Sequence, residues 1–138
     1  MHVPNRHLRS EILHYQARLR SWEDYCRRRA AMQRPGCRPL KPRPRVSDEL
    51  GSMILTLCTR LAERPNFAGY TFKDDLIGAA VLDCLSAVEK FNCVSSTSAF
   101  AYLTTCAWRR MAREISREAA WHAVPNPEPG TPAALYYG

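Results

Sequence analysis

Apolar and polar positions alternate with a helical period over the first third of the chain. The apolar positions recur at steps of four and three: Leu8, Ile12, Tyr15, Leu19, Trp22 and Cys26. A seam with a period of about 3.5 residues is typical of an amphipathic helix. Pro4-Asn5 is a start signal, and Pro35-Gly36 ends the pattern. The spacing therefore predicts one long helix within residues 1–33.

Three further stretches have the same period, and each follows a residue that can cap a helix. Ser47 can cap the first, while Thr71 and Asp74 have the spacing of a capping box for the second. The third begins after Thr97 or Ser98 and continues to about residue 121. The apolar stripes of the first two are Leu50, Met53, Ile54, Leu57, Cys58 and Leu61, then Leu76, Ile77, Ala80, Val81, Cys84, Leu85, Val88 and Phe91. Because no stretch has the period of a strand, the sequence predicts an all-α fold.

Proline marks the segments between and after these helices. Residues 34–46 contain four prolines and five basic residues, which favours an extended linker. Residues 122–138 contain four more prolines, which predicts a flexible tail. We therefore expect a compact helical domain at 47–121, with a basic helix and linker before it and an extended tail behind it.

Basic residues are concentrated at the N-terminal end. The 138 residues have a net charge of +7, and residues 1–46 alone contain twelve Lys/Arg against three acidic residues. Residues 47–91 contain four basic and seven acidic residues, whereas 98–121 contain four arginines and two glutamates. The basic helix at 1–33 is either a solvated face or a contact for nucleic acid or an acidic protein surface.

The sequence argues against several function classes. The six cysteines form no C-x-x-C pair and no zinc-finger spacing, so we expect reduced thiols and no metal site. No nucleophile–base pattern and no glycine-rich phosphate loop is present, so we expect no enzyme and no cofactor. The longest apolar run, around residues 53–58, is far shorter than the ~20 residues of a membrane span, and no signal peptide precedes it.

The last predicted helix has two chemically distinct arcs. Arg109, Arg113 and Arg117 step by four, which places them on one ridge, and Tyr102 lies along that ridge. Arginine neutralises phosphates and an aromatic ring stacks on an unpaired base, so the ridge suits single-stranded or melting DNA. The alternative is a solvated face with Glu114 and Glu118 nearby, and spacing does not separate the two.

Four strings of residues carry a family resemblance. Asp75-Leu76-Ile77 and Ala87-Val88-Glu89-Lys90-Phe91 resemble region 2 of sigma-70 family transcription initiation factors. The segment from Phe100 to Trp108 is similar to the family's segment that melts and reads the −10 element. With Tyr70-Thr71-Phe72-Lys73-Asp74 before them, these strings look closest to the late-transcription sigma factors of tailed bacteriophages. The likeness covers roughly residues 50–120 and implies a sigma region 2-like fold.

The resemblance implies two binding surfaces. The first would grip the β′ clamp helices of the bacterial RNA polymerase core through Asp75, Leu76, Gly78, Ala79, Leu82, Asp83 and Leu85. The second joins the arginine ridge to the matched segment and would bind promoter DNA through Tyr102, Thr105, Cys106, Trp108, Arg109, Arg110, Arg113 and Arg117. The expected function is initiation at phage late promoters, in the cytoplasm of the infected bacterial host.

The chain departs from the family in three places. Gly78-Ala79 stands where primary sigma factors have Gln-Glu, so the grip would rest on acidic residues and apolar packing. Cys106-Ala107 stands where the family has two tryptophans, and Leu103 aligns with the tyrosine that holds a flipped adenine. We also expect no helix-turn-helix that reads a −35 element, because few residues of this sequence follow Trp121.

Other functions stay open at this point. The chain could inhibit host transcription by occupying the clamp helices, or bind nucleic acid as a plain basic helical protein. The tail segment Ala133-Ala134-Leu135-Tyr136-Tyr137 has three alternatives: docking on a replication sliding clamp, contact within the transcription complex, or disorder. A phage co-activator or the sliding clamp could also be a partner of the factor.

Overall fold

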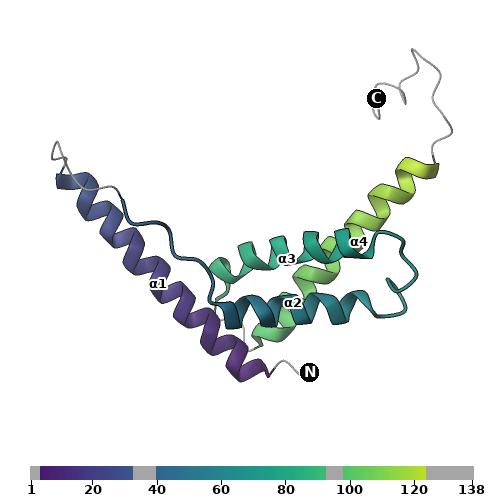
Figure 1. Ribbon diagram of the computed structural model, residues 1–138, viewed down its shortest axis with the longest axis horizontal. Coiled ribbons are helices and arrows are strands. Elements are labelled where there is room, and N and C mark those ends of the chain that lie inside the picture. Colours follow the sequence, from purple (N-terminus) through teal and green to yellow (C-terminus); the bar gives the residue numbers. More distant parts are fainter. Residues whose placement is uncertain (1–3, 33–39, 93–97, 124–138) are drawn as a thin grey trace, which may run out of the picture.

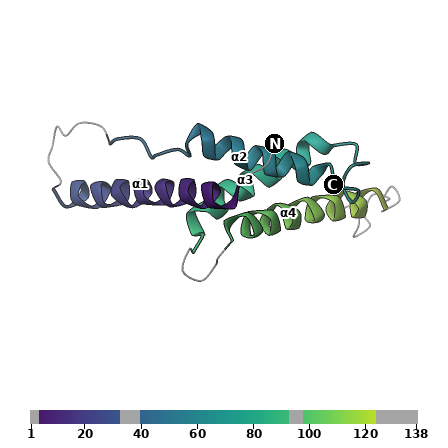
Figure 2. The ribbon, with the colours of Figure 1, turned by 90° about the horizontal axis from the view of Figure 1, so that it is seen from below.

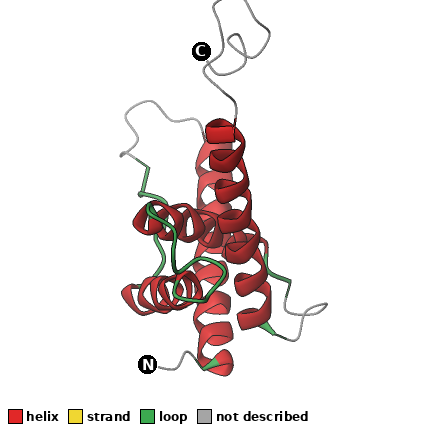
Figure 3. Cartoon of the chain, turned by 90° about the vertical axis from the view of Figure 1, so that its right-hand side faces the viewer, coloured by secondary structure: helices red, strands yellow, loops and turns green. Residues whose placement is uncertain are grey.

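The computed structural model describes residues 4–32, 40–92 and 98–123, with side chains up to residue 119. These residues form four helices and no strand, which confirms the all-α prediction (Figure 3). The helices are α1 (Asn5–Met32), α2 (Asp48–Ala62), α3 (Lys73–Lys90) and α4 (Ala99–Ala123). The segment at 124–138, which includes most of the predicted tail, lies outside the described residues, as do Cys37, Cys93 and Thr97.

The helices share one apolar core. α2 and α3 run side by side, and α4 packs against both of them (Figure 1). α1 contacts each of the other three helices, and its seam residues Leu8, Ile12, Tyr15 and Leu19 are buried in the same core. The basic N-terminal helix therefore belongs to the bundle. α1 and α4 extend beyond α2 and α3 at opposite ends (Figures 1 and 2).

Two of the predicted helix caps form, and one does not. Ser47 Oγ accepts a hydrogen bond from the Leu50 N–H (3.1 Å), and Ser98 Oγ accepts one from the Ala101 N–H (3.1 Å). The capping box of Thr71 and Asp74 was wrong: α3 begins one residue later, with Phe72 as its N-cap and no side-chain cap. The Phe72 ring packs edge-on against Tyr70, 6.1 Å between centroids, and its carbonyl accepts from the first turn of α3.

The described part of the predicted linker, residues 40–46, has no regular secondary structure and lies alongside α1 (Figures 1 and 2). Trp22 Nε1–H donates to the Lys41 carbonyl at 2.9 Å, and the Lys41 ammonium lies 5.1 Å from the Tyr25 ring centroid. Arg43 forms an ion pair with Glu89 of α3 at 2.8 Å. These contacts hold the segment against the bundle.

A polar contact joins α1 to the end of α3. Gln16 Nε2 donates to the carbonyls of Val88 and Phe91, each at 2.8 Å. Such carbonyls at a helix C-terminus have no partner within the helix, so the Gln16 amide satisfies groups that otherwise need water. None of the four helices has both the length and the apolar character needed to cross a membrane.

Candidate nucleic-acid and polymerase interface

The exposed face of α3 contains part of the predicted polymerase-binding set. Asp75, Gly78 and Leu82 are exposed and follow one another at steps of three and four, which places them on one side of the helix. The Leu82 side chain is 68% exposed, although most large apolar residues of α3 face the core. An exposed leucine on such a face is a suitable anchor for a protein partner.

The prediction for Leu76 needs a correction. Leu76 is 2% exposed and belongs to the core, so it holds α3 in the bundle and does not reach a partner. Its position one residue after Asp75 turns it by about 100°, from the exposed face toward the inside. Ala79 and Leu85 are half-buried, and Leu85 packs against the core.

Asp83 connects the two predicted surfaces. Its carboxylate accepts from Arg110 Nη1 at 3.2 Å and from Arg113 Nη2 at 3.5 Å, so it joins α3 to α4. Arg110 also pairs with Glu114 at 3.0 Å, and its side chain is only 28% exposed. Two carboxylates therefore compensate the Arg110 charge, which leaves it less available to DNA than Arg109 or Arg113.

A groove of about 390 Å³ lies between α3 and α4. Its lining comprises Asp83, Ser86, Ala87, Lys90, Tyr102, Cys106, Arg109, Arg110 and Arg113. Four cationic side chains face one carboxylate there, so the groove favours an anionic ligand such as a phosphate chain. The structure thus brings together five of the eight predicted DNA-binding residues.

Burial affects the ionisation of two groove residues with weakly acidic side chains, Tyr102 and Cys106. The Tyr102 ring lies 5.4 Å from the Phe91 ring, and desolvation raises the pKa of its phenol. Desolvation, with smaller charge effects, also raises the pKa of the Cys106 thiol. Both groups stay neutral near pH 7, so Tyr102 can donate a hydrogen bond or stack, and Cys106 is a weak nucleophile.

Three residues of the predicted DNA-binding set, Thr105, Trp108 and Arg117, do not line the groove. Arg117 does not line the groove, and it pairs with Glu114 at 3.6 Å. Trp108 lies on another side of α4, 42% exposed, with its ring 6.0 Å from that of Phe67. Six residues separate Tyr102 from Trp108, a turn of about 600° that points them in different directions. Thr105 is exposed, and its hydroxyl donates to a carbonyl of its own helix at 2.9 Å.

The tertiary structure adds two findings to the predicted DNA-binding surface. Lys90 and Ser86 of α3 line the groove, although every residue of the predicted DNA-binding set lies on α4. Leu103, the position aligned with the family's base-binding tyrosine, is fully buried, whereas its neighbour Tyr102 reaches the groove. Lys90 reaches the groove because α3 packs against α4, and the spacing along either helix alone does not show this.

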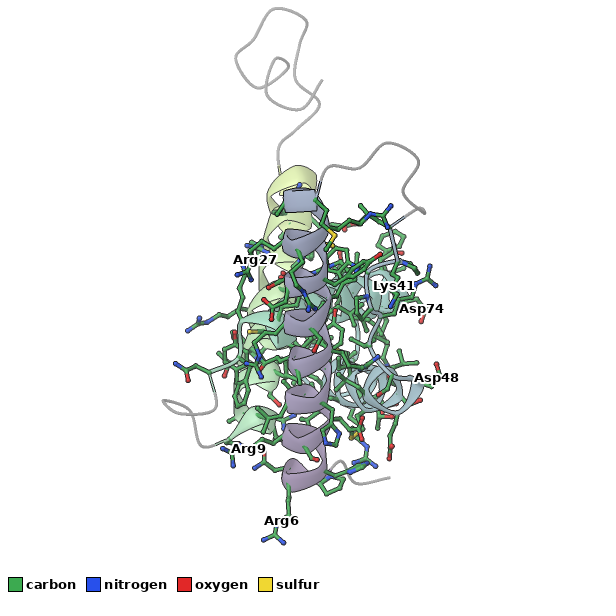
Figure 4. The ribbon with its side chains drawn as sticks, turned by 90° about the vertical axis from the view of Figure 1, so that its left-hand side faces the viewer. Arg6, Arg9, Arg27, Lys41, Asp48 and Asp74 are labelled. Carbon is green, nitrogen blue, oxygen red and sulfur yellow. The ribbon has the colours of Figure 1, made fainter. Side chains whose placement is uncertain are left out.

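The outer surface of α1 carries further positive charge. Arg9 and Arg27 project to the side opposite Lys41 and Asp48, and Arg6 points away from the first turn (Figure 4). Arg27 pairs with Asp24 at 2.8 Å within the helix. This surface is compatible with both alternatives for the N-terminal helix, a solvated face or a polyanion contact.

No protein-family model matches this chain, and no curated protein matches it significantly. The likeness to sigma region 2 therefore stays a prediction from the residues, and the functional conclusion depends on the geometry of α3 and α4.

Proposed function

We propose that the chain is a sigma-like transcription initiation factor that binds the core of bacterial RNA polymerase. It directs the enzyme to phage late promoters by recognising and melting a −10-like element, in the cytoplasm of the infected host. The observation that carries the proposal is the position of the basic groove beside the exposed face of α3. Leu82 lies on that face, and Ser86, one turn later, lines the groove.

The two surfaces differ in the partner that they favour. The face of α3 combines an exposed leucine with Asp75, and the chain from 47 to 91 has seven acidic and four basic residues. This face of α3 suits a basic protein surface with an apolar patch, as a clamp helix would provide. The groove has a positive surplus and an aromatic residue, which suits a nucleic-acid strand. A factor that bridges polymerase and promoter needs both surfaces at once.

A second function has specific support. Asp83 and Glu114 compensate part of the arginine charge, and Trp108 lies apart from Tyr102, so the DNA-melting surface is small. A protein with the α3 face alone would occupy the clamp helices and exclude the host sigma factor. This inhibitor is the alternative function.

In vitro transcription distinguishes the two. The purified chain is added to bacterial core polymerase with the DNA that encodes the chain as template, and separately to holoenzyme on a host promoter. New specific starts with core polymerase support the initiation factor, while loss of holoenzyme transcription without new starts supports the inhibitor. If neither reaction changes, both functions are wrong and the chain is a basic helical protein of another kind.

The groove is tested by Arg109→Ala/Arg113→Ala, with Arg60→Ala/Arg64→Ala as a control of equal charge change at exposed positions outside the groove. We expect the groove variant to keep polymerase binding and to lose open complexes, measured by permanganate footprinting. Each lost phosphate contact also reduces the salt dependence of DNA binding, by about 0.7–0.9 in the slope of log K against log salt. Unchanged footprints in the groove variant would refute the role of the groove.

A further inference from the structure

Three potential metal ligands meet where α1 and α2 begin. His7 and Glu11 lie four residues apart on one face of α1, and Glu49 lies in the first turn of α2. One ligand atom from each, an imidazole nitrogen and two carboxylate oxygens, lies within 4.8 Å of the other two. His7 Nε2 contacts Glu49 Oε1 directly. None of these residues belongs to the α3 face or to the groove.

A neighbouring serine holds one of the three ligands in place by a hydrogen bond. Ser47 Oγ donates to Glu11 Oε2 at 3.0 Å and accepts from the Leu50 N–H at 3.1 Å. The serine thereby caps α2 and orients a carboxylate of the cluster at the same time. Hydrogen bonds of this kind around a metal site hold the ligands in place and raise its affinity.

We propose that His7, Glu11 and Glu49 bind a divalent transition-metal ion that joins the start of α1 to the start of α2. An imidazole with two carboxylates is a ligand set that Zn²⁺ accepts, and three protein ligands leave a position for water. Mg²⁺ prefers oxygen ligands only, so the histidine favours the transition metal.

Charge and access both support the ion. Without a cation, the carboxylates of Glu11 and Glu49 repel each other across a few ångströms, and a dication between them removes that repulsion. The side chains of His7 and Glu49 are 43% and 59% exposed, so an ion can enter from solvent. The alternative is a plain surface contact between His7 and Glu49 with no ion.

The ion would tie α1 to the bundle. His7 and Glu49 are 42 residues apart, and the unfolded chain does not hold them together. An ion that binds only the folded arrangement stabilises it by mass action. The N-terminal helix would then attach more firmly in the metal-loaded protein.

The experiment titrates the metal-free full chain with Zn²⁺ by calorimetry and by the shift in melting temperature. We expect saturation at one site and a rise in Tm of about 5 °C or more at a hundredfold excess over Kd. His7→Gln and Glu49→Gln should each weaken binding at least about tenfold. His14→Gln, an exposed histidine of the same helix, is the matched control and should bind as the wild type does.

Co²⁺ substitution separates this site from the cysteines. Nitrogen and oxygen ligands give weak visible bands, whereas thiolates give an intense near-ultraviolet band. Circular dichroism of the metal-free variants shows whether each is folded. Glu49→Gln changes a ligand on α2, whereas His7→Gln changes one on α1, so the two variants test the site independently. A thiolate band, equal binding by wild type and both variants, or no rise in Tm would each overturn the proposal.

Discussion

Leu82→Lys tests the α3 face directly. Leu82 is 68% exposed on that face, so its side chain contributes little to the core. The substitution keeps the helix, since lysine has a helix propensity close to that of leucine. We expect the free energy of unfolding to change by no more than about 0.5 kcal/mol.

The effect on polymerase binding follows from the exposed area. Complete burial of a leucine side chain is worth about 1.5–3 kcal/mol, so covering the 68% that is exposed is worth about 1–2 kcal/mol. Loss of that amount weakens the affinity about 5- to 30-fold. This is a lower bound, because the variant also places an ammonium group against the partner.

Binding is measured by fluorescence anisotropy with labelled chain and bacterial core polymerase, and folding by urea denaturation. Leu55→Lys is the matched control, because Leu55 is 52% exposed on α2 and undergoes the same chemical change. We expect the Leu55 variant to bind as the wild type does. If a folded Leu82 variant binds core polymerase with wild-type affinity, the α3 face is not the polymerase contact.

Three further predictions concern stability and ionisation. The hydrogen bond to Glu118 raises the pKa of Tyr70 to about 12, so Glu118→Gln should lower it toward 10, followed by ultraviolet titration against the wild type. Because the Tyr70 pKa is higher in the folded state, its contribution to stability is complete below about pH 10 and is lost between about pH 10 and 12. Gln16→Leu should cost about 1–3 kcal/mol in urea denaturation, since two carbonyls at the end of α3 lose their donor. Leu103→Ala, in a fully buried position, should cost about 2–5 kcal/mol, and a smaller loss would mean that the α3–α4 core collapses around the cavity.

Apolar spacing determined the helices of this protein. Each predicted helix forms, because a periodic apolar face can be buried only when the chain adopts the matching secondary structure. Local capping was predictable where the side chain reaches its own helix, as Ser47 and Ser98 do. It failed at Thr71, because α3 begins one residue later, after Phe72, whose side chain cannot cap a helix and packs on Tyr70.

Only the tertiary structure decided which side chains act together. Spacing along α4 placed Arg117 with Arg109 and Arg113. The groove, however, depends on where α3 packs against α4, and its lining includes Lys90 of α3 but not Arg117. Leu76 lies in a string that resembles a binding motif, yet the packing of α3 buries it. His7 and Glu49 meet although 42 residues separate them. Sequence periodicity records which face of each helix is apolar, whereas contacts between helices depend on how those faces pack, and no local pattern contains that information.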